Sequence, residues 1–427
     1  MAFETNWLRW PFERKNRTFR VYVVEPIKYE PKEHGAIFNA TITNLIAPTP
    51  QELLSSDNPT NVKKAADPDL IVFPEAFLSS DDLILMLQKL TQLDQFGCLH
   101  IGLRPNYSEQ RHLFQVAEIN ELILRLKKIP SLFEADLENF SSWLERQQVG
   151  DNFNLACMFT LDPDKKIRVC LHPKLVRSKF EFSALYDEHM IEANLLSLVT
   201  LEPRNRKFMT VTVQPMICSD GLLLPTDAVR AGPLEAFTDS ATNFPEMTPD
   251  HIDIVSLSLC TPLQKLDHRG GGTYRQWHSE FRKTFVRAAE EDACPRHHFA
   301  TFVMANFGSI PDVPVAGMSG AFMPIPLPEM QHPESISLSS YGTESRTSDP
   351  TWVNAMNTSD HAASHGCPPK VHEIGRGYLA CLDVPATNKE NCATILGFTI
   401  TRMVRDNPRL GPVQGLTRFE IRSVANP

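Results

Sequence analysis

Runs of apolar residues recur along the chain and are separated by more polar segments. Such runs are typical of strands that a fold buries on one or both faces, whereas apolar residues spaced three and four apart are typical of helices. The runs that predict strands are 19–26, 69–75, 98–105, 156–161, 167–173, 208–218, 252–259, 299–308 and 378–385. Helical spacing is found over 81–93 and from about 109 to 146. The alternation predicts an α/β protein.

The predicted sheet is not wholly parallel. Runs 156–161 and 167–173 are separated by Asp-Pro-Asp-Lys-Lys, which is turn chemistry of the kind that joins antiparallel strands. From 328 to 375 the sequence is rich in Ser, Thr, Pro, His and Asn and loses its periodicity. We therefore expect a long flexible excursion over that segment.

Three of the predicted strands end at a residue able to take part in chemistry. One delivers Glu75 after a proline, another delivers Lys174 after a proline, and the third ends in Cys218. The carboxyl ends of strands are where α/β proteins place their chemistry. Each residue also has an ordinary explanation by itself, as a helix-start acid, a solvated lysine and an inert core thiol. Together they supply a base, a cation and a nucleophile, which acyl transfer requires.

The ordered trio resembles the signature of the nitrilase, or carbon–nitrogen hydrolase, superfamily, in which a Glu, a Lys and a Cys each follow a strand. The three motifs are FPEAF, HPKL and ICSD. Other features are similar as well: the paired strands before the lysine, the helix with the pair Arg287 and Ala288, the strand that ends in Asn306, and the hairpin GMSGAFMP. The chain is identified from these motifs as a divergent and enlarged member.

The resemblance implies a four-layer αββα sandwich that assembles as a homo-oligomer. A carbon–nitrogen hydrolase domain would span 19–390, between an N-terminal extension 1–18 and a C-terminal extension 391–427. Additions to the minimal domain are expected near 107–150, 221–250 and 262–276, besides the flexible excursion 328–375.

The resemblance also assigns roles to residues. Cys218 attacks the carbon, Lys174 and a backbone N–H near Ser219 hold the oxyanion, and Glu75 carries the proton. A second glutamate, Glu181 or its neighbour Glu188, orients the lysine. No metal or organic cofactor is needed, because thiol and lysine supply the covalent step and the positive charge.

The residue two positions after the cysteine bears on the substrate. Asp220 is closer to the pattern of amidases than to that of true nitrilases, which favours a small-molecule amide or carbamoyl substrate over a nitrile. If Asp220 and Asp227 line the pocket, the substrate lacks a strongly anionic tail.

Composition limits the partners and the location of the chain. It has 51 acidic and 42 basic residues, a net charge of -9 and no long basic stripe, so we expect no nucleic acid partner. The N-terminus lacks the apolar stretch of a secretory signal, and no run of about 18 apolar residues occurs elsewhere. We therefore expect a cytoplasmic protein without a stable membrane anchor. Its 9 cysteines include no CxxC pair, so we expect reduced thiols.

Other interpretations compete with the hydrolase. The same thioester can pass its acyl group to an amine, and the scaffold can serve as a binding or regulatory module. His361, His365, Cys367 and His372 offer zinc ligands, but their spacing matches no standard finger, so a solvated loop is favoured there. The glycines of HRGGG at 268–272 lack the lysine–serine ending of a P-loop and favour a loop at the pocket rim.

Overall fold

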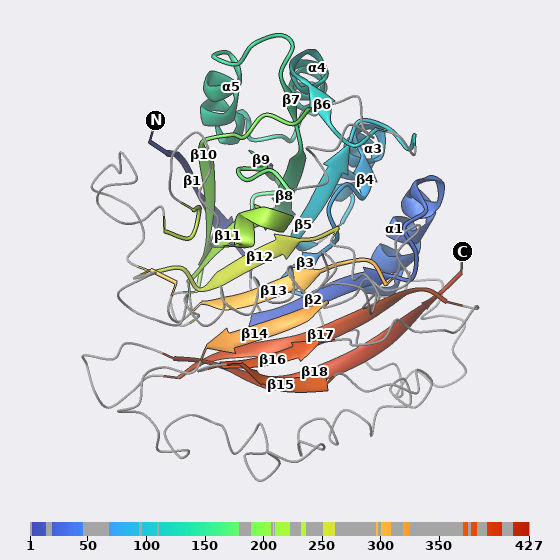
Figure 1. The fold of residues 1–427 in the computed structure, drawn as a ribbon, viewed down its shortest axis with the longest axis vertical. Helices are drawn as coiled ribbons and strands as arrows, with labels where there is room; N and C mark the ends of the chain where they lie inside the picture. Colours follow the sequence, from blue (N-terminus) through green and yellow to red (C-terminus); the bar gives the residue numbers. More distant parts are fainter. Residues whose placement is uncertain are drawn as a thin grey trace, which may run out of the picture.

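Two mixed β-sheets packed face to face form the centre of the molecule (Figure 1). The first has the strand order β1-β10-β11-β12-β13-β14-β16-β15, and the second has the order β18-β17-β2-β3-β5-β8-β9, with β4 paired to β5. In this computed structural model the described residues are 2–13, 19–45, 68–93, 96–108, 111–178, 189–205, 208, 210–222, 232–235, 251–260, 296–297, 300–308, 319–324, 370–374, 377–381, 391–403 and 413–426.

The strands of the first sheet are, in chain order, β1 (Glu4–Phe12), β10 (Leu195–Pro203), β11 (Val211–Ile217), β12 (Ile254–Ser258), β13 (Thr301–Ala305), β14 (Gly320–Pro324), β15 (Lys370–Ile374) and β16 (Gly377–Cys381). Those of the second are β2 (Phe19–Pro26), β3 (Leu70–Val72), β4 (Leu78–Ser79), β5 (Phe96–Arg104), β8 (Leu155–Leu161), β9 (Ile167–Pro173), β17 (Asn391–Met403) and β18 (Val413–Ala425). A separate short pair joins β6 (Phe114–Gln115) to β7 (Asn152–Phe153).

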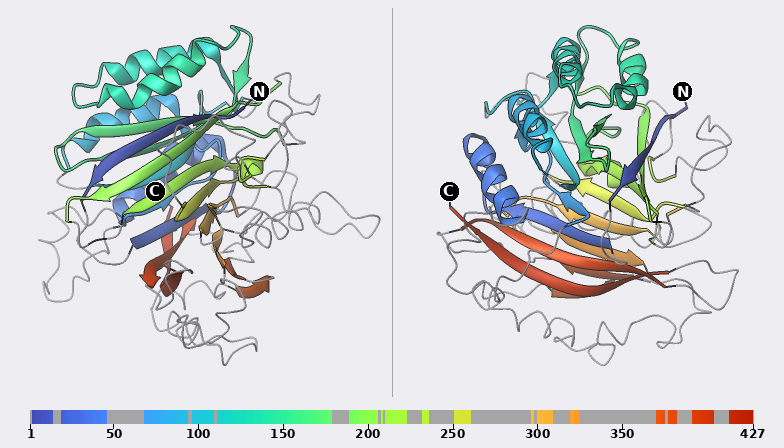
Figure 2. Two further views of the ribbon diagram at one scale, coloured as in Figure 1. Left: turned by 90° about the vertical axis from the view of Figure 1, so that its left-hand side faces the viewer. Right: turned by 180° about the vertical axis from the view of Figure 1, so that it is seen from behind.

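Helices line the outer side of the second sheet and its upper end (Figures 1 and 2). They are α1 (Pro31–Leu45), α3 (Ser80–Leu90), α4 (Val116–Lys127), the 3-10 turn η2 (Glu134–Leu137) and α5 (Glu138–Leu144). Among the described helices, none is both long and apolar enough to span a bilayer. The mixed α/β class predicted from the apolar pattern is thus confirmed at the level of two sheets with few helices.

Alternate residues of β2 lie in two different apolar clusters, one on each face of the second sheet, so both faces of this sheet are buried. Val21 and Val23 of β2 lie in the apolar cluster between the sheets, whereas Tyr22 and Val24 lie in the cluster that includes helix residues such as Phe38. A strand with two covered faces needs apolar residues at every position, and the continuous apolar runs of the sequence have this origin.

The expected antiparallel pair is confirmed. Leu155 pairs with Pro173 at one end of the β8–β9 ladder, and Leu161 pairs with Ile167 at the other. In the turn between them, Asp162 Oδ1 accepts the backbone N–H groups of Asp164 and Lys166, each at 2.9 Å.

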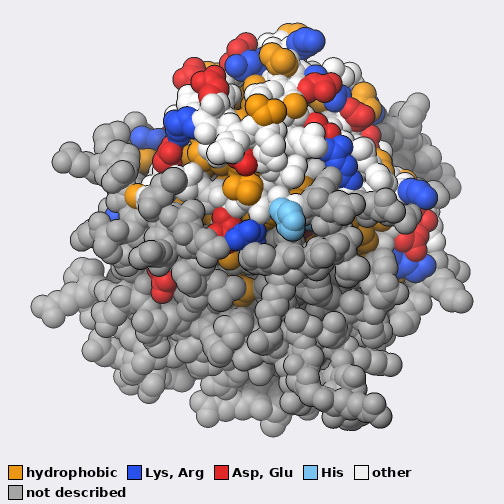
Figure 3. All heavy atoms as spheres, turned by 45° about the horizontal axis from the view of Figure 1, so that its top comes forward, with side chains coloured by type: hydrophobic (Ala, Val, Ile, Leu, Met, Phe, Trp, Pro, Cys, Tyr) orange, Lys and Arg blue, Asp and Glu red, His pale blue; other side chains and the backbone are white. Residues whose placement is uncertain are grey.

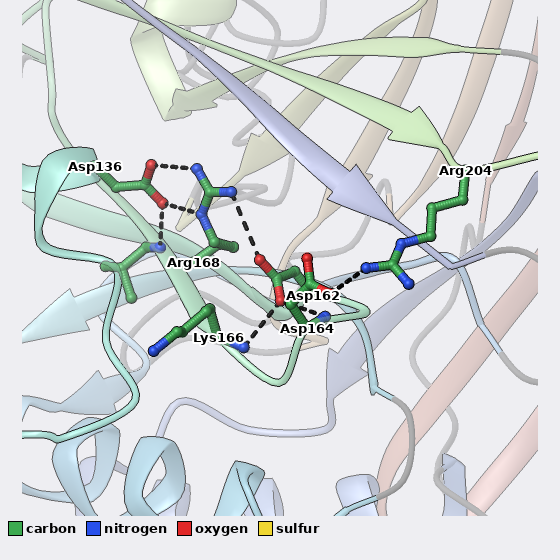
Figure 4. Close-up of polar contacts among 7 residues, drawn as sticks. Asp136, Asp162, Asp164, Lys166, Arg168 and Arg204 are labelled. Carbon is green, nitrogen blue, oxygen red and sulfur yellow. Dashed lines mark hydrogen bonds and ion pairs between the residues drawn. The ribbon is translucent and has the colours of Figure 1, made fainter.

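A buried ion pair fixes this end of the hairpin (Figure 4). Arg168 of β9 donates two hydrogen bonds to Asp136 of η2, at 2.8 and 2.7 Å, and its other terminal nitrogen lies 3.7 Å from Asp162. Arg204 and Asp164 form a second, exposed ion pair nearby. The insertion expected at 107–150 is therefore tied to the sheet through Asp136.

The terminal segments both complete a sheet. β1 pairs in parallel with β10, and β17 lies between β2 and β18. The boundaries expected at 19 and 390 thus do not mark the edges of the sheets, because strand pairing continues beyond them. At the end of the expected flexible excursion, β15 pairs with β16, so residues 370–374 are a strand, while 325–369 lie outside the described residues.

On the face shown in Figure 3, hydrophobic, basic and acidic side chains are interspersed over the described surface. Exposed apolar side chains among the described residues include Leu85 of α3 and Leu124 of α4. No patch of one charge dominates the described part of this face.

Candidate active site

The turn that follows β3 holds Glu75 against β5. Phe73 N–H donates to the His100 carbonyl at 2.8 Å, Gly102 N–H donates to the Pro74 carbonyl at 3.0 Å, and Phe77 N–H donates to the Gly102 carbonyl at 2.9 Å. A Cβ at position 102 would lie 2.4 Å from Ala76 N and 2.4 Å from Glu75 Cα. The turn approaches the strand this closely only because residue 102 is a glycine.

Ala76, next to Glu75, adopts a left-handed conformation with φ of 50°. This region costs a non-glycine residue roughly 1–2 kcal/mol, so the surrounding hydrogen bonds must hold the turn in place. Strain of this kind often marks functional sites. Here it directs the Glu75 side chain into the interior, where it is 5% exposed.

Glu75 and Lys174 form a buried ion pair. Lys174 Nζ lies 2.8 Å from Glu75 Oε1, and Lys174 is 1% exposed. Asn154 supports both residues. Its side-chain amide donates to Glu75 Oε1 at 2.7 Å, and its backbone carbonyl accepts the Lys174 backbone N–H at 2.8 Å. Additional hydrogen bonds of this kind offset the desolvation of a buried pair.

The segment after β12 completes the surroundings of Glu75. Glu75 N–H donates to the Leu259 carbonyl at 3.1 Å, and Cys260 N–H donates to Glu75 Oε2, also at 3.1 Å. The carboxylate is therefore held from the second sheet by Lys174 and Asn154 and from the first sheet by Cys260.

Cys218 ends β11 and begins the short 3-10 turn η4 (Cys218–Gly221). Its φ of 46° is left-handed, and the residue is 3% exposed. Such a strained turn at a strand end is the second in this site, after that of Ala76.

The two residues that follow the cysteine, Ser219 and Asp220, connect this turn to the loop that follows Lys174. Asp220 Oδ1 accepts the N–H groups of Leu175 and Val176, each at 2.8 Å, and Oδ2 accepts that of Ile217 at 3.0 Å. Ser219 donates its hydroxyl hydrogen to the Val176 carbonyl. Burial raises the pKa of Asp220 to about 8, although Lys174 and the three amides act to lower the pKa.

The pKa of the Cys260 thiol depends on the charged groups around it. Desolvation of its sulfur raises the pKa of Cys260 well above the ordinary value; Glu75 and Cys218 raise that pKa further, whereas Lys174 and Arg104 lower it. Charge interactions weaken with distance, so the Cys260 thiol lies near the carboxylate, the ammonium and the Cys218 thiol.

A pair of histidines lies in the interior behind the site. His100 of β5 and His172 of β9 approach within 3.1 Å between their Nε2 atoms, and His100 Nδ1 lies 2.7 Å from Ser256 Oγ of β12. Burial lowers the pKa of His172 to about 3 and that of His100 below its ordinary value. This neutral polar group connects the two sheets.

The structure brings together the three residues predicted from strand ends, Glu75, Lys174 and Cys218. The oxygens of Asp220, a residue expected near the pocket, accept three backbone amides of the turns. The predicted site residues outside the described part are Glu181, Glu188, Asp227, Arg287, Ala288, the glycines 270–272, His361, His365 and Cys367, whereas His372 lies on β15.

Sequence reasoning missed Asn154, Cys260 and Arg104. Asn154 lies between the short strand β7 and β8, before the predicted run 156–161, and Cys260 acts on Glu75 through its backbone, so neither had a side-chain signal. Arg104 did have a side-chain signal, because it ends a predicted strand directly before Pro105. Glu75 shows the similar pattern of a charged residue directly after Pro74.

Comparison with known proteins adds no identification: no family model, curated protein or solved structure matches the chain.

Proposed function

We propose that this chain is a thiol-dependent amidohydrolase that cleaves a non-peptide carbon–nitrogen bond through a thioester on Cys218. The observation that carries the proposal is the buried Glu75–Lys174 contact of 2.8 Å, together with the hydrogen bonds by which Asp220 joins the turn of Cys218 to the loop that follows Lys174. A carboxylate, an ammonium and a thiol in one desolvated compartment are the groups that acyl transfer uses.

In the first half of the reaction, Glu75 accepts the proton of the Cys218 thiol as sulfur bonds to the carbonyl carbon. The carbonyl oxygen becomes an oxyanion near Lys174 and a backbone N–H after Cys218, and one such donor contributes about 3–4 kcal/mol in the transition state. When the intermediate collapses, the carbon–nitrogen bond breaks and the nitrogen leaves with the proton from Glu75.

In the second half, a water attacks the thioester while Glu75 takes one of its protons. The carbon–sulfur bond then breaks, the proton returns to sulfur, and an acid leaves. Asn154 and the Cys260 amide hold the carboxylate through both halves. Amide and carbamoyl substrates are favoured over nitriles by the motif resemblance at Asp220.

The resemblance to the nitrilase superfamily extends the proposal to a four-layer αββα sandwich and a cytoplasmic homo-oligomer. Size-exclusion chromatography with light scattering tests the oligomer. A mass equal to that of one 48.2 kDa chain would reject this part.

The activity itself is tested by ammonia release from small amides, carbamoyl compounds and nitriles. Cys218→Ala is expected to lower turnover by at least about 10⁴-fold, because the covalent step is removed. Cys260→Ser is the matched control, since its backbone amide stays in place, and it should retain activity within about tenfold. Equal turnover by the Cys218→Ala variant and the unmodified chain would reject the proposal.

Hydrolysis is separated from acyl transfer by the products. Added hydroxylamine competes with water for the thioester, so both mechanisms give some hydroxamate. A hydrolase gives the free acid when the amine is left out, whereas an obligate transferase turns over only when the amine is present.

A further inference from the structure

Arg104 is a fully buried cation without a carboxylate partner in the described part of the chain. Its Nε donates to the Asn106 carbonyl at 2.6 Å, and Nη2 donates to the carbonyls of Ser108 and Arg111. Nη1 has only two long contacts, at 3.5 Å each, with the Tyr29 hydroxyl and the Ala76 carbonyl. All five acceptors are neutral, so no carboxylate among the described residues balances the positive charge of Arg104.

The other buried arginine of this sheet shows the usual arrangement. Arg168 makes a two-bond ion pair with Asp136, and Asp162 lies 3.7 Å away. Burying an unpaired charge is costly, because the group loses its hydration without gaining a counter-charge. A protein that retains such a group gains something from its charge.

The position of Arg104 connects this charge to the candidate active site. Side chains two apart on a strand share a face, so Cys98, His100, Gly102 and Arg104 all lie on one face of β5. Cys98 belongs to the cluster between the sheets, and His100 contacts Ser256 across them. Arg104 thus continues this inner face to the carboxyl end of β5, beside the turn that carries Glu75.

Two titratable groups respond to the guanidinium. Arg104 lowers the pKa of the Cys260 thiol, and it adds to burial in lowering the pKa of His34 to about 3. Cys260 is the residue whose amide contacts Glu75 and whose thiol also senses Cys218.

The charges around Cys218 need this cation. Glu75 and Lys174 neutralise each other. When the thiol loses its proton to solvent, the buried compartment gains one net negative charge, whereas transfer of that proton to Glu75 leaves Lys174 to balance the anion. Arg104 lies at the turn next to Glu75, through its contact with the Ala76 carbonyl, and has no carboxylate partner in the described part of the chain.

We propose that Arg104 is the second fixed positive charge of this site, a positioning residue that stabilises the resting Cys218 thiolate, whose proton has gone to solvent, while Lys174 is paired with Glu75. This role rests on the proposed function, because it requires that Cys218 become a thiolate. The guanidinium acts through space and through the Ala76 turn, without touching the reacting atoms.

The test compares two variants that both shorten the side chain and that differ in charge. Arg104→Lys keeps the positive charge, and Arg104→Gln removes it. The rate of Cys218 alkylation by iodoacetamide is measured from pH 5 to 10 by peptide mass spectrometry, with circular dichroism to establish folding. Arg168→Gln is the control, because it removes the paired arginine of the same sheet.

The expected result is a profile for Arg104→Gln whose half-maximal rate moves up by about one pH unit, with alkylation about tenfold slower at pH 7, which is the effect of one charge roughly 12 Å away at an effective dielectric near 20. Arg104→Lys should restore the profile to within about twofold, and Arg168→Gln should leave it unchanged. Coincident profiles for the Lys and Gln variants would overturn the proposal. If the Gln variant does not fold, the Lys variant decides, since a shift of one pH unit despite its retained charge also overturns it.

The same alkylation experiment distinguishes failure of the proposed function from failure of the role of Arg104. If Cys218 of the unmodified chain does not react while other cysteines do, the nucleophile is wrong and Arg104 has no thiolate to balance. If Cys218 reacts selectively but does not respond to residue 104, the hydrolase survives and only the role of Arg104 is rejected.

Discussion

Asp220 Oδ1 accepts the backbone N–H of Val176 at 2.8 Å, and this contact joins the turn of the candidate nucleophile to the loop of the candidate cation. The same oxygen accepts the N–H of Leu175, and the second oxygen accepts that of Ile217. One side chain thereby fixes Cys218 relative to Lys174, although the two are distant in sequence. The distance between sulfur and ammonium depends on a residue that itself has no part in the chemistry.

Replacing Asp220 by Ala is expected to lower the free energy of unfolding by about 3 kcal/mol or more, because three buried amides lose their acceptor. Urea unfolding measures this loss. Asp151→Ala is the control, since Asp151 accepts one exposed amide, that of Gln148, and its loss should be much smaller. Equal losses for the two variants would contradict the structural role of Asp220.

Gly102→Ala is expected to displace the turn of Glu75, because the new Cβ would lie 2.4 Å from Ala76 N, a backbone atom that has no room to yield. We expect at least about a hundredfold loss of amide turnover, since a shift of about 1 Å in a positioned group costs that much. Gly150→Ala is the control, because nothing lies within 4 Å of its Cβ. Turnover of the Gly102→Ala variant at the level of the control would show that the turn does not position Glu75.

The two ion pairs of Figure 4 should differ in their contribution to stability. Asp136→Ala leaves Arg168 buried without its partner and is expected to lower the free energy of unfolding by about 3–5 kcal/mol. Arg204→Ala removes the exposed pair with Asp164, with side chains 51% and 65% exposed, and no measurable change is expected. Denaturant titration measures both, and a small effect of Asp136→Ala would argue against a buried pair.

The buried histidines predict acid sensitivity. A lowered pKa in the folded state means that the unfolded chain binds the proton more tightly, so this stability is present above pH 6.5 and is lost as the pH falls toward 3. His172→Gln removes one such group, and its free energy of unfolding should fall less steeply by about 1.4 kcal/mol per pH unit in that window. The exposed His189→Gln variant is the control. Parallel slopes for His172→Gln and the unmodified chain would mean that His172 titrates alike in both states.

Three residues of the candidate site could be predicted from the sequence because each one directly follows a continuous apolar run. The runs before Glu75, Lys174 and Cys218 are continuous because their strands are buried on both faces. The end of each run therefore predicts where its strand ends. Asn154 and Cys260 could not be found in this way, since their contacts with Glu75 span 79 and 185 residues and one of them uses only a backbone amide. The sheet positions of the terminal strands were also hidden, because strand order depends on pairing across the whole chain and not on local pattern.

The central claim is that Cys218 is the nucleophile of a compartment that contains Glu75 and Lys174. Mass spectrometry of the native protein, incubated with an amide substrate and quenched in acid, tests it most directly by locating the acyl group. The account predicts an acyl adduct on the peptide that contains Cys218, and none there in the Cys218→Ala variant. An adduct on Cys260 or another residue, with Cys218 unmodified, would contradict it.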